Sequence, residues 1–525
     1  MSKKLIEFTG EIDYPYTCAI VNNQIMGFLE EVEEPTSIEL LDVSTGEGRR
    51  TYERTLAFLY YVSLKKCEPD LKIFIKNSVG DSLYGEIPGA GNDIIGKLRE
   101  EAIRIANANK EIKRLQMTKE SAIRKLEKES GGYDTNALRY LSKDTISIYS
   151  LEGYFTYFAG PLLHRTGILK VFDIVPFSNG FLILLPRKGN PEELSAIPES
   201  PKLFETINES KKWEETLEVK NAEDLNKSIT TGKISNIIKI QEALHEKKIA
   251  SIANEISQRR SKLVLIAGPS SSGKTTFAKK LEIQLRVIGL KPFTLSTDNY
   301  FIDRERTPLS ENGTPDYDSF QAVDHELLEE HIMHLLNGEE VELSKYNFIT
   351  GKQERGRRIK LDYNGVLVVE GIHSLNPELT DLVDEKYKFK VYVSVLTQIN
   401  IDSINRVPTR DARLIRRIVR DVHFRGIGAS ETIRRWPTVI NSEERNIFPY
   451  QENADVMFDS SLIYELALLR TYAEVPLRAI GSREKEYGEA LRLLNFLSHF
   501  LPIMPDEIPP TSIVREFIGR SSFRY

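Results

Sequence analysis

The chain has 525 residues, of which 40% are hydrophobic and 28% are charged, and its formal net charge is -6. This balance is typical of a globular protein, and the length predicts three or four domains at ~150 residues each. The acidic charge argues against a protein that coats nucleic acid, and two cysteines, Cys18 and Cys67, are too few for a disulfide framework or a cysteine zinc site.

The first residues, MSKKLIEFTGEIDYPYT, lack the apolar core of a signal peptide. No apolar stretch approaches the ~18 residues that a membrane span requires. We therefore expect a protein without membrane contact in the reducing cytoplasm.

The first half of the chain mixes strand and helix patterns. We expect short strands and turns over 1–45, a loop at IPGAGN (87–92), a charged helical stretch over 93–130, and strands within 154–186. The charge run favours a solvated helix face over an RNA-binding site. A connector rich in Pro, Glu, Lys and Asn follows over 187–233, and apolar spacing predicts a helix from Ile234 to Gln258.

From Lys262 the pattern becomes a strand–helix alternation. Apolar runs in KLVLIAG, KPFTLSTDNYF, GVLVVEG and KFKVYVSV alternate with helical spacing, which predicts an α/β fold with a mostly parallel sheet flanked by helices. The last 40 residues are expected to be helical, apart from IPPTS (508–512).

A phosphate-binding loop follows the first of these strands. GPSSSGKT, residues 268–275, fits the pattern G-x-x-x-x-G-K-[ST], whose backbone N–H groups cradle phosphates at a helix N-terminus. The lysine reaches the β- and γ-phosphates and the following hydroxyl ligates Mg²⁺. We predict ATP binding by Gly268, Ser270, Ser271, Ser272, Gly273, Lys274, Thr275 and Thr276, with Thr275 also a metal ligand.

Two acidic residues end later strands. Asp298 lies opposite the phosphate loop in such a sheet and could accept the proton of an attacking hydroxyl. Glu370 could hold Mg²⁺ or its waters. The alternatives are an ordinary Asp-Asn turn and an acid at a helix start.

The segment RDARLIRRIVRDVHFRG (410–426) carries a stripe of arginines. Arg410, Arg413, Arg417 and Arg420 share one helix face, with Arg416 and Arg425 beside it. This pattern favours a lid that closes over transferring phosphate, and a solvated basic face or an RNA patch is the alternative.

Residues 262–480 resemble the uridine kinase branch of the phosphoribulokinase/uridine kinase family. The resemblance rests on GPSSSGKTTFAKKL, STDNYF, PDYDSFQAVDHELL, YNFITGKQ, VVEGIHSL, RDARLIRRIVRDVHFRG and WPTVINSEERNIFPYQENADVMFDS, in family order. It implies that Asp298 is the general base for a nucleoside 5'-hydroxyl. Lys274 of the phosphate loop is also expected to be catalytic, because it holds the γ-phosphoryl group. It also implies a substrate site that includes Asp318, Tyr346, Phe348 and Arg413, with Arg413 and Arg416 as catalytic lid arginines.

One departure leaves the acceptor open. The family's uridine and cytidine enzymes carry a histidine shortly after the tyrosine, whereas this chain has Gly351 in that region and no histidine until His373. A nucleoside acceptor is favoured, with another sugar or polyol as the first alternative. An RNA-binding regulatory protein with an ATP switch is the second.

The N-terminal half resembles two modules of threonyl-tRNA synthetases. CAIVNNQIMGFLEEVEEPTSIELLD resembles the later half of a TGS domain, and AGPLLHRTGILKVFDI echoes the editing domain. Phe158 and Leu162 stand where that domain has a Cys and a His, and the first histidine of the chain is His164. We therefore expect a binding or regulatory module without zinc or editing chemistry, and tRNA binding and self-association stay open.

These patterns predict five units. They are a partial TGS-like unit over 1–45, an α+β editing-domain-like unit over 46–190, a connector and helix over 191–258, a P-loop kinase over 259–480, and a helical tail over 481–525.

Overall fold

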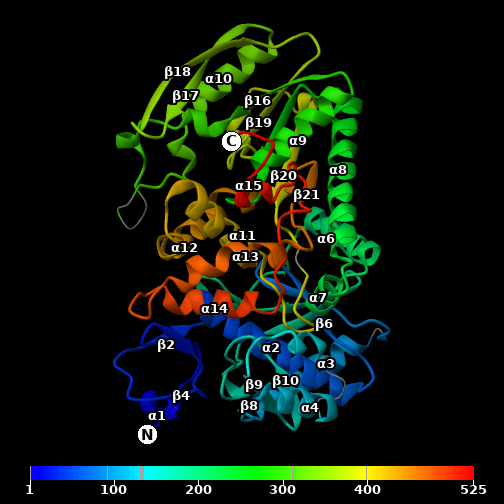
Figure 1. The fold of residues 1–525 in the computed structure, drawn as a ribbon, viewed down its shortest axis with the longest axis vertical. Helices are drawn as coiled ribbons and strands as arrows, with labels where there is room; N and C mark the ends of the chain where they lie inside the picture. Colours follow the sequence, from blue (N-terminus) through cyan, green and yellow to red (C-terminus); the bar gives the residue numbers. More distant parts are fainter. Residues whose placement is uncertain (1, 92, 130–134, 310–312, 314, 398) are drawn as a thin grey trace.

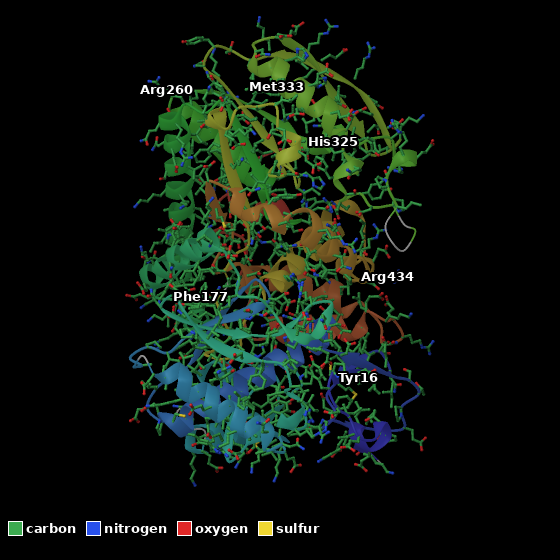
Figure 2. The ribbon with its side chains drawn as sticks, turned by 180° about the vertical axis from the view of Figure 1, so that it is seen from behind. Tyr16, Phe177, Arg260, His325, Met333 and Arg434 are labelled. Carbon is green, nitrogen blue, oxygen red and sulfur yellow. The ribbon has the colours of Figure 1, made fainter. Side chains whose placement is uncertain are left out.

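The computed structural model describes residues 2–91, 93–129, 135–309, 313, 315–397 and 399–525. The N-terminal elements lie at one end of the long axis and the parallel sheet at the other, with helices α11 to α14 between them (Figure 1). From behind, Tyr16 lies near one end of the molecule, while His325 and Met333 of α10 lie near the other (Figure 2). Among the described residues, no helix has both the length and the apolarity needed to cross a membrane.

The first 45 residues form mostly short strands, as expected. The antiparallel sheet has the order β3-β2-β5, and Cys18, Ala19 and Val21 of β2 are buried. The sequence patterns did not indicate the one-turn helix α1. The bounds are β1 Lys3–Lys4, α1 Leu5–Thr9, β2 Tyr16–Val21, β3 Gln24–Met26, β4 Glu31–Val32 and β5 Ile38–Asp42.

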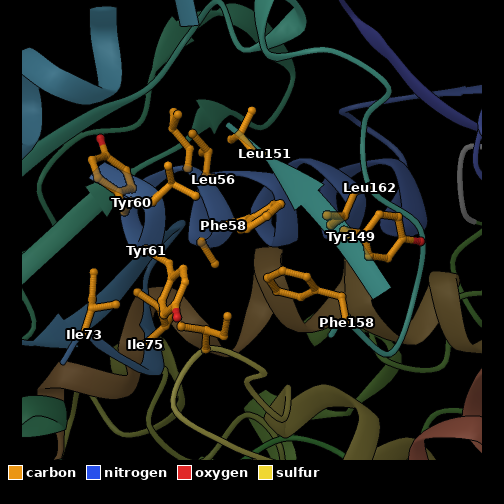
Figure 3. Close-up of a cluster of buried hydrophobic side chains, with 14 of the residues drawn as sticks. Leu56, Phe58, Tyr60, Tyr61, Ile73, Ile75, Tyr149, Leu151, Phe158 and Leu162 are labelled. Carbon is orange, nitrogen blue, oxygen red and sulfur yellow. The ribbon is translucent and has the colours of Figure 1, made fainter. Parts of the chain in front are cut away.

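A long buried helix organises the next unit. Helix α2, Gly46–Cys67, is capped by the Thr45 side chain, which accepts a hydrogen bond from Gly48 N. Phe58 of α2 packs with Phe158, and Leu162 lies in the same core (Figure 3). Two antiparallel sheets surround the helix, with the orders β11-β12-β7-β6 and β10-β9-β8. Their strands are β6 Phe74–Val79, β7 Ser82–Glu86, β8 Lys113–Thr118, β9 Thr145–Leu151, β10 Tyr154–Tyr157, β11 Asp173–Phe177 and β12 Gly180–Leu184.

The expectation of a continuous helical stretch over 93–130 is wrong in the middle. Strand β8 separates α3, Ile94–Asn107, from α4, Lys119–Glu129, and pairs with β9 over its whole length. Leu115 and Met117 alternate with polar residues and pack against the core. The charged residues around β8 obscure this strand-like alternation in the sequence, and pairing with β9 stabilises the strand. A short helix, α5 Asn136–Arg139, follows.

The connector expected over 187–233 is largely helical. After the hairpin of β13 Pro186–Arg187 and β14 Asn190–Leu194 come α6 Pro201–Leu217 and α7 Ala222–Thr230. Leu203, Phe204 and Ile207 bury one face of α6 together with Thr206 and Ser210, while its charged residues stay at least partly exposed. The following helix, α8 Ile234–Arg259, agrees with its predicted bounds to within a residue at each end.

The second half contains the predicted α/β sheet. Five parallel strands have the order β16-β19-β15-β20-β21, and β15 is buried along its whole length. One sheet face packs on α8 and α9, and the other packs on α10 and α6. The bounds are β15 Leu263–Ala267, α9 Lys274–Val287, β16 Lys291–Ser296, α10 His325–Leu336, β19 Gly365–Glu370, β20 Lys388–Ser394 and β21 Val456–Asp459.

The remaining elements are a hairpin and further helices. A hairpin, β17 Glu340–Asn347 with β18 Lys352–Lys360, leaves the sheet beside α10. Residues 498–514 of the expected helical tail contain turns instead of an α-helix. The helices are α11 Thr409–Arg420, α12 Ala429–Asn446, α13 Glu465–Arg478, α14 Tyr487–Leu497 and α15 Arg515–Ile518.

Candidate active site

The phosphate loop joins β15 to α9 in a conformation that only certain residues permit. A Cβ on Gly268 would lie 1.9 Å from the Val393 carbonyl oxygen, so the backbone passes too close for any side chain. Ser271 and Gly273 have φ angles of 59° and 86°, in the left-handed region. The buried Ser272 hydroxyl has no hydrogen-bond partner among the described residues. Such a loop of turned N–H groups is suited to phosphate.

Four predicted residues meet where the strands end. Lys274 Nζ donates to the Pro269 carbonyl at 3.0 Å, and Thr275 Oγ1 lies 3.5 Å from Glu370 Oε2. Burial lowers the pKa of Lys274, while the charges of Glu370 and Asp298 oppose that shift. The structure therefore brings Lys274, Thr275, Asp298 and Glu370 into one electrostatic cluster.

Both acids of this cluster have raised pKa values. Burial, together with the charge of the neighbouring Asp298, raises the pKa of Glu370 to about 7. The pKa of Asp298 is raised by desolvation and lowered by Lys274, Arg420 and Arg425. A bound cation would stabilise the charged forms of two carboxylates that lie this close together.

The chemistry of these donors fits Mg²⁺. Hydroxyl and carboxylate oxygens are its preferred protein ligands, and few are needed because the ion keeps waters and phosphate oxygens. Thr275 and Glu370 would hold the ion, and the raised Glu370 pKa is consistent with a carboxylate placed for a cation.

Asp318 is a buried acid within reach of the charges of Arg417, Glu443 and Asp298. Burial raises its pKa to about 6, and the charge of Arg417 opposes the shift. Its carbonyl oxygen accepts from Asn446 Nδ2 at 3.2 Å, so α12 positions the segment. His373 lies in the same region, where its ring packs at 5.5 Å from Phe320 and burial lowers its pKa to about 4.

An aromatic cluster extends from the Asp298 segment. Phe301 packs against Tyr346 at 5.6 Å and Phe348 at 6.4 Å, while Tyr346 and Phe348 are 5.1 Å apart. Tyr346 is buried, whereas Phe348 is 61% exposed. The accessible ring of this cluster is therefore that of Phe348, and the buried Tyr346 packs against it.

Gly351 closes the hairpin turn beside this cluster. Its φ is 70°, and an added Cβ would lie 2.9 Å from the Arg304 side chain. Arg304 N donates to the Gly351 carbonyl at 2.8 Å, and Arg304 Nη2 donates to the Phe348 carbonyl at 2.6 Å. The turn thus requires glycine, and the Arg304 side chain occupies the space into which a side chain at position 351 would project.

Arg413 and Arg416 do not lie where a lid was expected. Arg413, 3% exposed, pairs with Glu443, donates to the Ser270 carbonyl at 3.2 Å, and lies over the Trp436 ring at 5.4 Å. Arg416 is fully buried and pairs with Glu465 at 2.5 Å and the Ser460 carbonyl at 2.7 Å. Both arginines contact backbone carbonyls of the phosphate loop from the side of the protein core, because the face of α11 that carries them packs against the core.

Other arginines of the same stretch lie near Ser270, Asp318 and Asp298. Arg417 Nη1 donates to Ser270 Oγ at 2.7 Å, and the charge of Arg417 opposes the rise in the Asp318 pKa. The charges of Arg420 and Arg425 lower the pKa of Asp298. Arg410 lies apart, where it pairs with Glu444 at 2.6 Å. The stripe contained these residues, but its spacing alone did not separate them from Arg413 and Arg416.

Two acids that the sequence patterns did not single out also contact the loop. Glu443 Oε1 accepts from Ser270 N at 2.9 Å, and Glu516 Oε2 accepts from Thr276 Oγ1 at 2.6 Å. Glu443 lies within one of the matched motif stretches, which is a signal that could have identified it. Nothing local in the sequence marks Glu516.

The second half of the chain is similar in sequence to known kinases. Residues 263–465 match the phosphoribulokinase/uridine kinase family. The chain is 30% identical to a uridine kinase of Halobacterium salinarum over 37% of its length and 77% of that protein. It is 32% identical to uridine-cytidine kinase C of Dictyostelium discoideum over 33% of each chain, so it spans only a third of that relative.

A solved structure described as a possible uridine kinase from Bacillus stearothermophilus is 20% identical, with a TM-score of 0.27 over 38% of this chain and 89% of that one. The sequence match shows that the chain is a kinase that belongs to the phosphoribulokinase/uridine kinase family.

Proposed function

We propose that this protein transfers the γ-phosphoryl group of ATP to the 5'-hydroxyl of a nucleoside. The observation that carries the proposal is the meeting of Lys274, Thr275 and Glu370 with Asp298 at one edge of the sheet, with Asp318 on the acceptor side. Uridine kinases among the relatives support the acceptor class.

Each residue has a role that its surroundings support. The amides of the phosphate loop and Lys274 hold the triphosphate, and bound Mg²⁺ would neutralise charge on its oxygens. Asp298 orients the acceptor hydroxyl and takes its proton, for which a raised pKa is favourable. Asp318 binds the sugar hydroxyls, and Arg417, Arg420 and Arg425 stabilise the transferring group, while Arg413 and Arg416 position the loop. Catalysis of this kind is mainly positioning and electrostatics.

A phosphorylated sugar is a second candidate acceptor. The observation that favours it is Arg304, an exposed guanidinium fixed to the Phe348 carbonyl beside the aromatic cluster. Guanidinium groups bind phosphate oxygens well, whereas a pyrimidine offers no such charge.

The test is product formation across a panel of acceptors. ATP consumption is measured with nucleosides, free polyols and sugar phosphates, and product mass is determined. A nucleoside monophosphate as the main product supports the proposal, and consumption only with a sugar phosphate supports the second candidate.

Asp298→Asn provides the matched variant. We expect turnover to fall by at least ~100-fold, since a positioned base contributes about that much. ATP affinity should stay within about twofold, because the variant keeps the phosphate loop. Full turnover in this variant would refute the role of Asp298 as base.

The contacts of the N-terminal half do not assign it a catalytic role. We propose that it is a binding or regulatory module, because Phe158 and Leu162, where editing chemistry would need ligands, are core residues. Glu53 on α2 pairs with Arg406 at 3.2 Å, so this half contacts the loop that leads to α11.

A further inference from the structure

The last fifteen residues pack against the phosphate loop, although they lie beyond the family match at 263–465. A Cβ on Gly273 would lie 2.6 Å from Ile513 Cγ2, and the Phe517 ring lies 5.1 Å from the Arg416 guanidinium. The chain end lies close to α15, in the part of the molecule that also holds α9 (Figure 1). The donor side of the site is therefore built partly from a segment far away in the sequence.

Glu516 places a carboxylate at the start of α9. Its Oε2 atom accepts from Thr276 Oγ1 at 2.6 Å and from Thr276 N at 3.4 Å, and its Oε1 atom lies 3.1 Å from Arg420 Nη1. Thr276 is fully buried and Glu516 is 5% exposed. The carboxylate thus holds two donors of the phosphate loop region and one arginine of α11.

The chain end supports this contact through a line of hydroxyl groups. The Tyr525 hydroxyl lies 2.9 Å from Thr276 Oγ1 and 3.0 Å from Ser521 Oγ. Because Thr276 Oγ1 donates its proton to Glu516, it can only accept from Tyr525, which in turn accepts from Ser521. Tyr525 as a whole residue remains 54% exposed.

These donors are the kind that nucleotide phosphates use. Thr276 is the third residue of α9, so its N–H belongs to the first turn, which has no partner inside the helix. First-turn amides after a phosphate loop cradle phosphate oxygens, and a carboxylate has the same charge and acceptor chemistry.

We infer that Glu516 occupies the place of a nucleotide phosphate oxygen and competes with ATP for Thr276 and Arg420. The inference rests on the donor side of the proposed function and adds a residue that sets nucleotide affinity. ATP binding then exchanges the Glu516–Arg420 pair for a phosphate–Arg420 pair. Arg420 leaves Glu516 only when a nucleotide binds. Nucleotide binding therefore brings Arg420 to the triphosphate, where it joins Arg417 and Arg425.

The test is ATP affinity, measured by calorimetry on the full chain. Glu516→Gln keeps the shape and removes the charge, so we expect ATP to bind about tenfold tighter, which corresponds to about 1.4 kcal/mol. Glu507→Gln is the control, because Glu507 is an exposed acid of the same segment, and its affinity should not change. The inference is overturned if Glu516→Gln binds ATP with an affinity within twofold of the parent, or more weakly than the parent.

A second variant covers the case in which Glu516→Gln fails to fold. Tyr525→Phe removes the hydroxyl that supports the contact at an exposed position, and we expect about threefold tighter ATP binding. Unchanged affinity in this variant would then overturn the inference.

Lys274→Ala separates this result from the proposed function. If the parent chain binds ATP and Lys274→Ala does not, the donor site is in place, and the Glu516 result can be interpreted. If the parent chain binds no ATP, both the donor site and the inference are refuted.

Discussion

The buried pair of Glu443 and Arg413 offers a direct test of how the phosphate loop is held. Glu443 accepts from Ser270 N and pairs with Arg413, which also donates to the Ser270 carbonyl. Glu443→Gln keeps an oxygen acceptor for Ser270 N and removes the charge that compensates Arg413. The perturbation therefore isolates the ion pair from the backbone contact.

The expected magnitude follows from burial. The two side chains are 2% and 3% exposed, and removing one partner of a buried pair costs about 3–5 kcal/mol because an uncompensated charge remains. The retained amide offsets part of this, so we expect a loss of about 3 kcal/mol in the free energy of unfolding. The adjacent pair of Glu444 and Arg410 is 30% and 40% exposed, and Glu444→Gln should cost less than about 1 kcal/mol.

Denaturant unfolding of both variants provides the measurement. The transition that reports the P-loop unit should shift its midpoint in Glu443→Gln and hardly shift in Glu444→Gln, with similar slopes. Equal losses in the two variants would show that burial does not determine the strength of this contact, and the reasoning would be wrong. Weaker ATP binding should accompany the loss in Glu443→Gln only.

Two further predictions concern the reaction. Because burial raises the pKa of Glu370 to about 7, and a carboxyl is protonated below its pKa, kcat/KM should rise between pH 6 and 8 at low Mg²⁺. Saturating Mg²⁺ should move this rise to lower pH, and an unchanged profile would contradict the metal role of Glu370. Arg304→Ala should change the ratio of kcat/KM between charged and neutral acceptors by about tenfold, measured against Arg306→Ala as control. An unchanged ratio would exclude Arg304 from acceptor selection.

The sequence alone determined the parts of this site that are local. A phosphate loop needs glycines, a lysine and a hydroxyl within eight residues, and its position between a strand and a helix can be read from hydrophobic spacing. Asp298 and Glu370 were also predictable, because the carboxyl ends of parallel strands meet at one edge of the sheet. The parallel sheet and α8 followed from the same apolar patterns.

Other features depended on how elements dock. Six arginines spread around α11 and the turn after it, and only the packing of α11 decides that Arg416 is buried on Glu465 while Arg420 faces the site. Strand β8 exists because β9 pairs with it, which a charged sequence does not reveal. Glu516 reaches Thr276 across 240 residues of chain. Spacing along a helix or strand specifies which residues share a face, but long-range packing decides what that face meets.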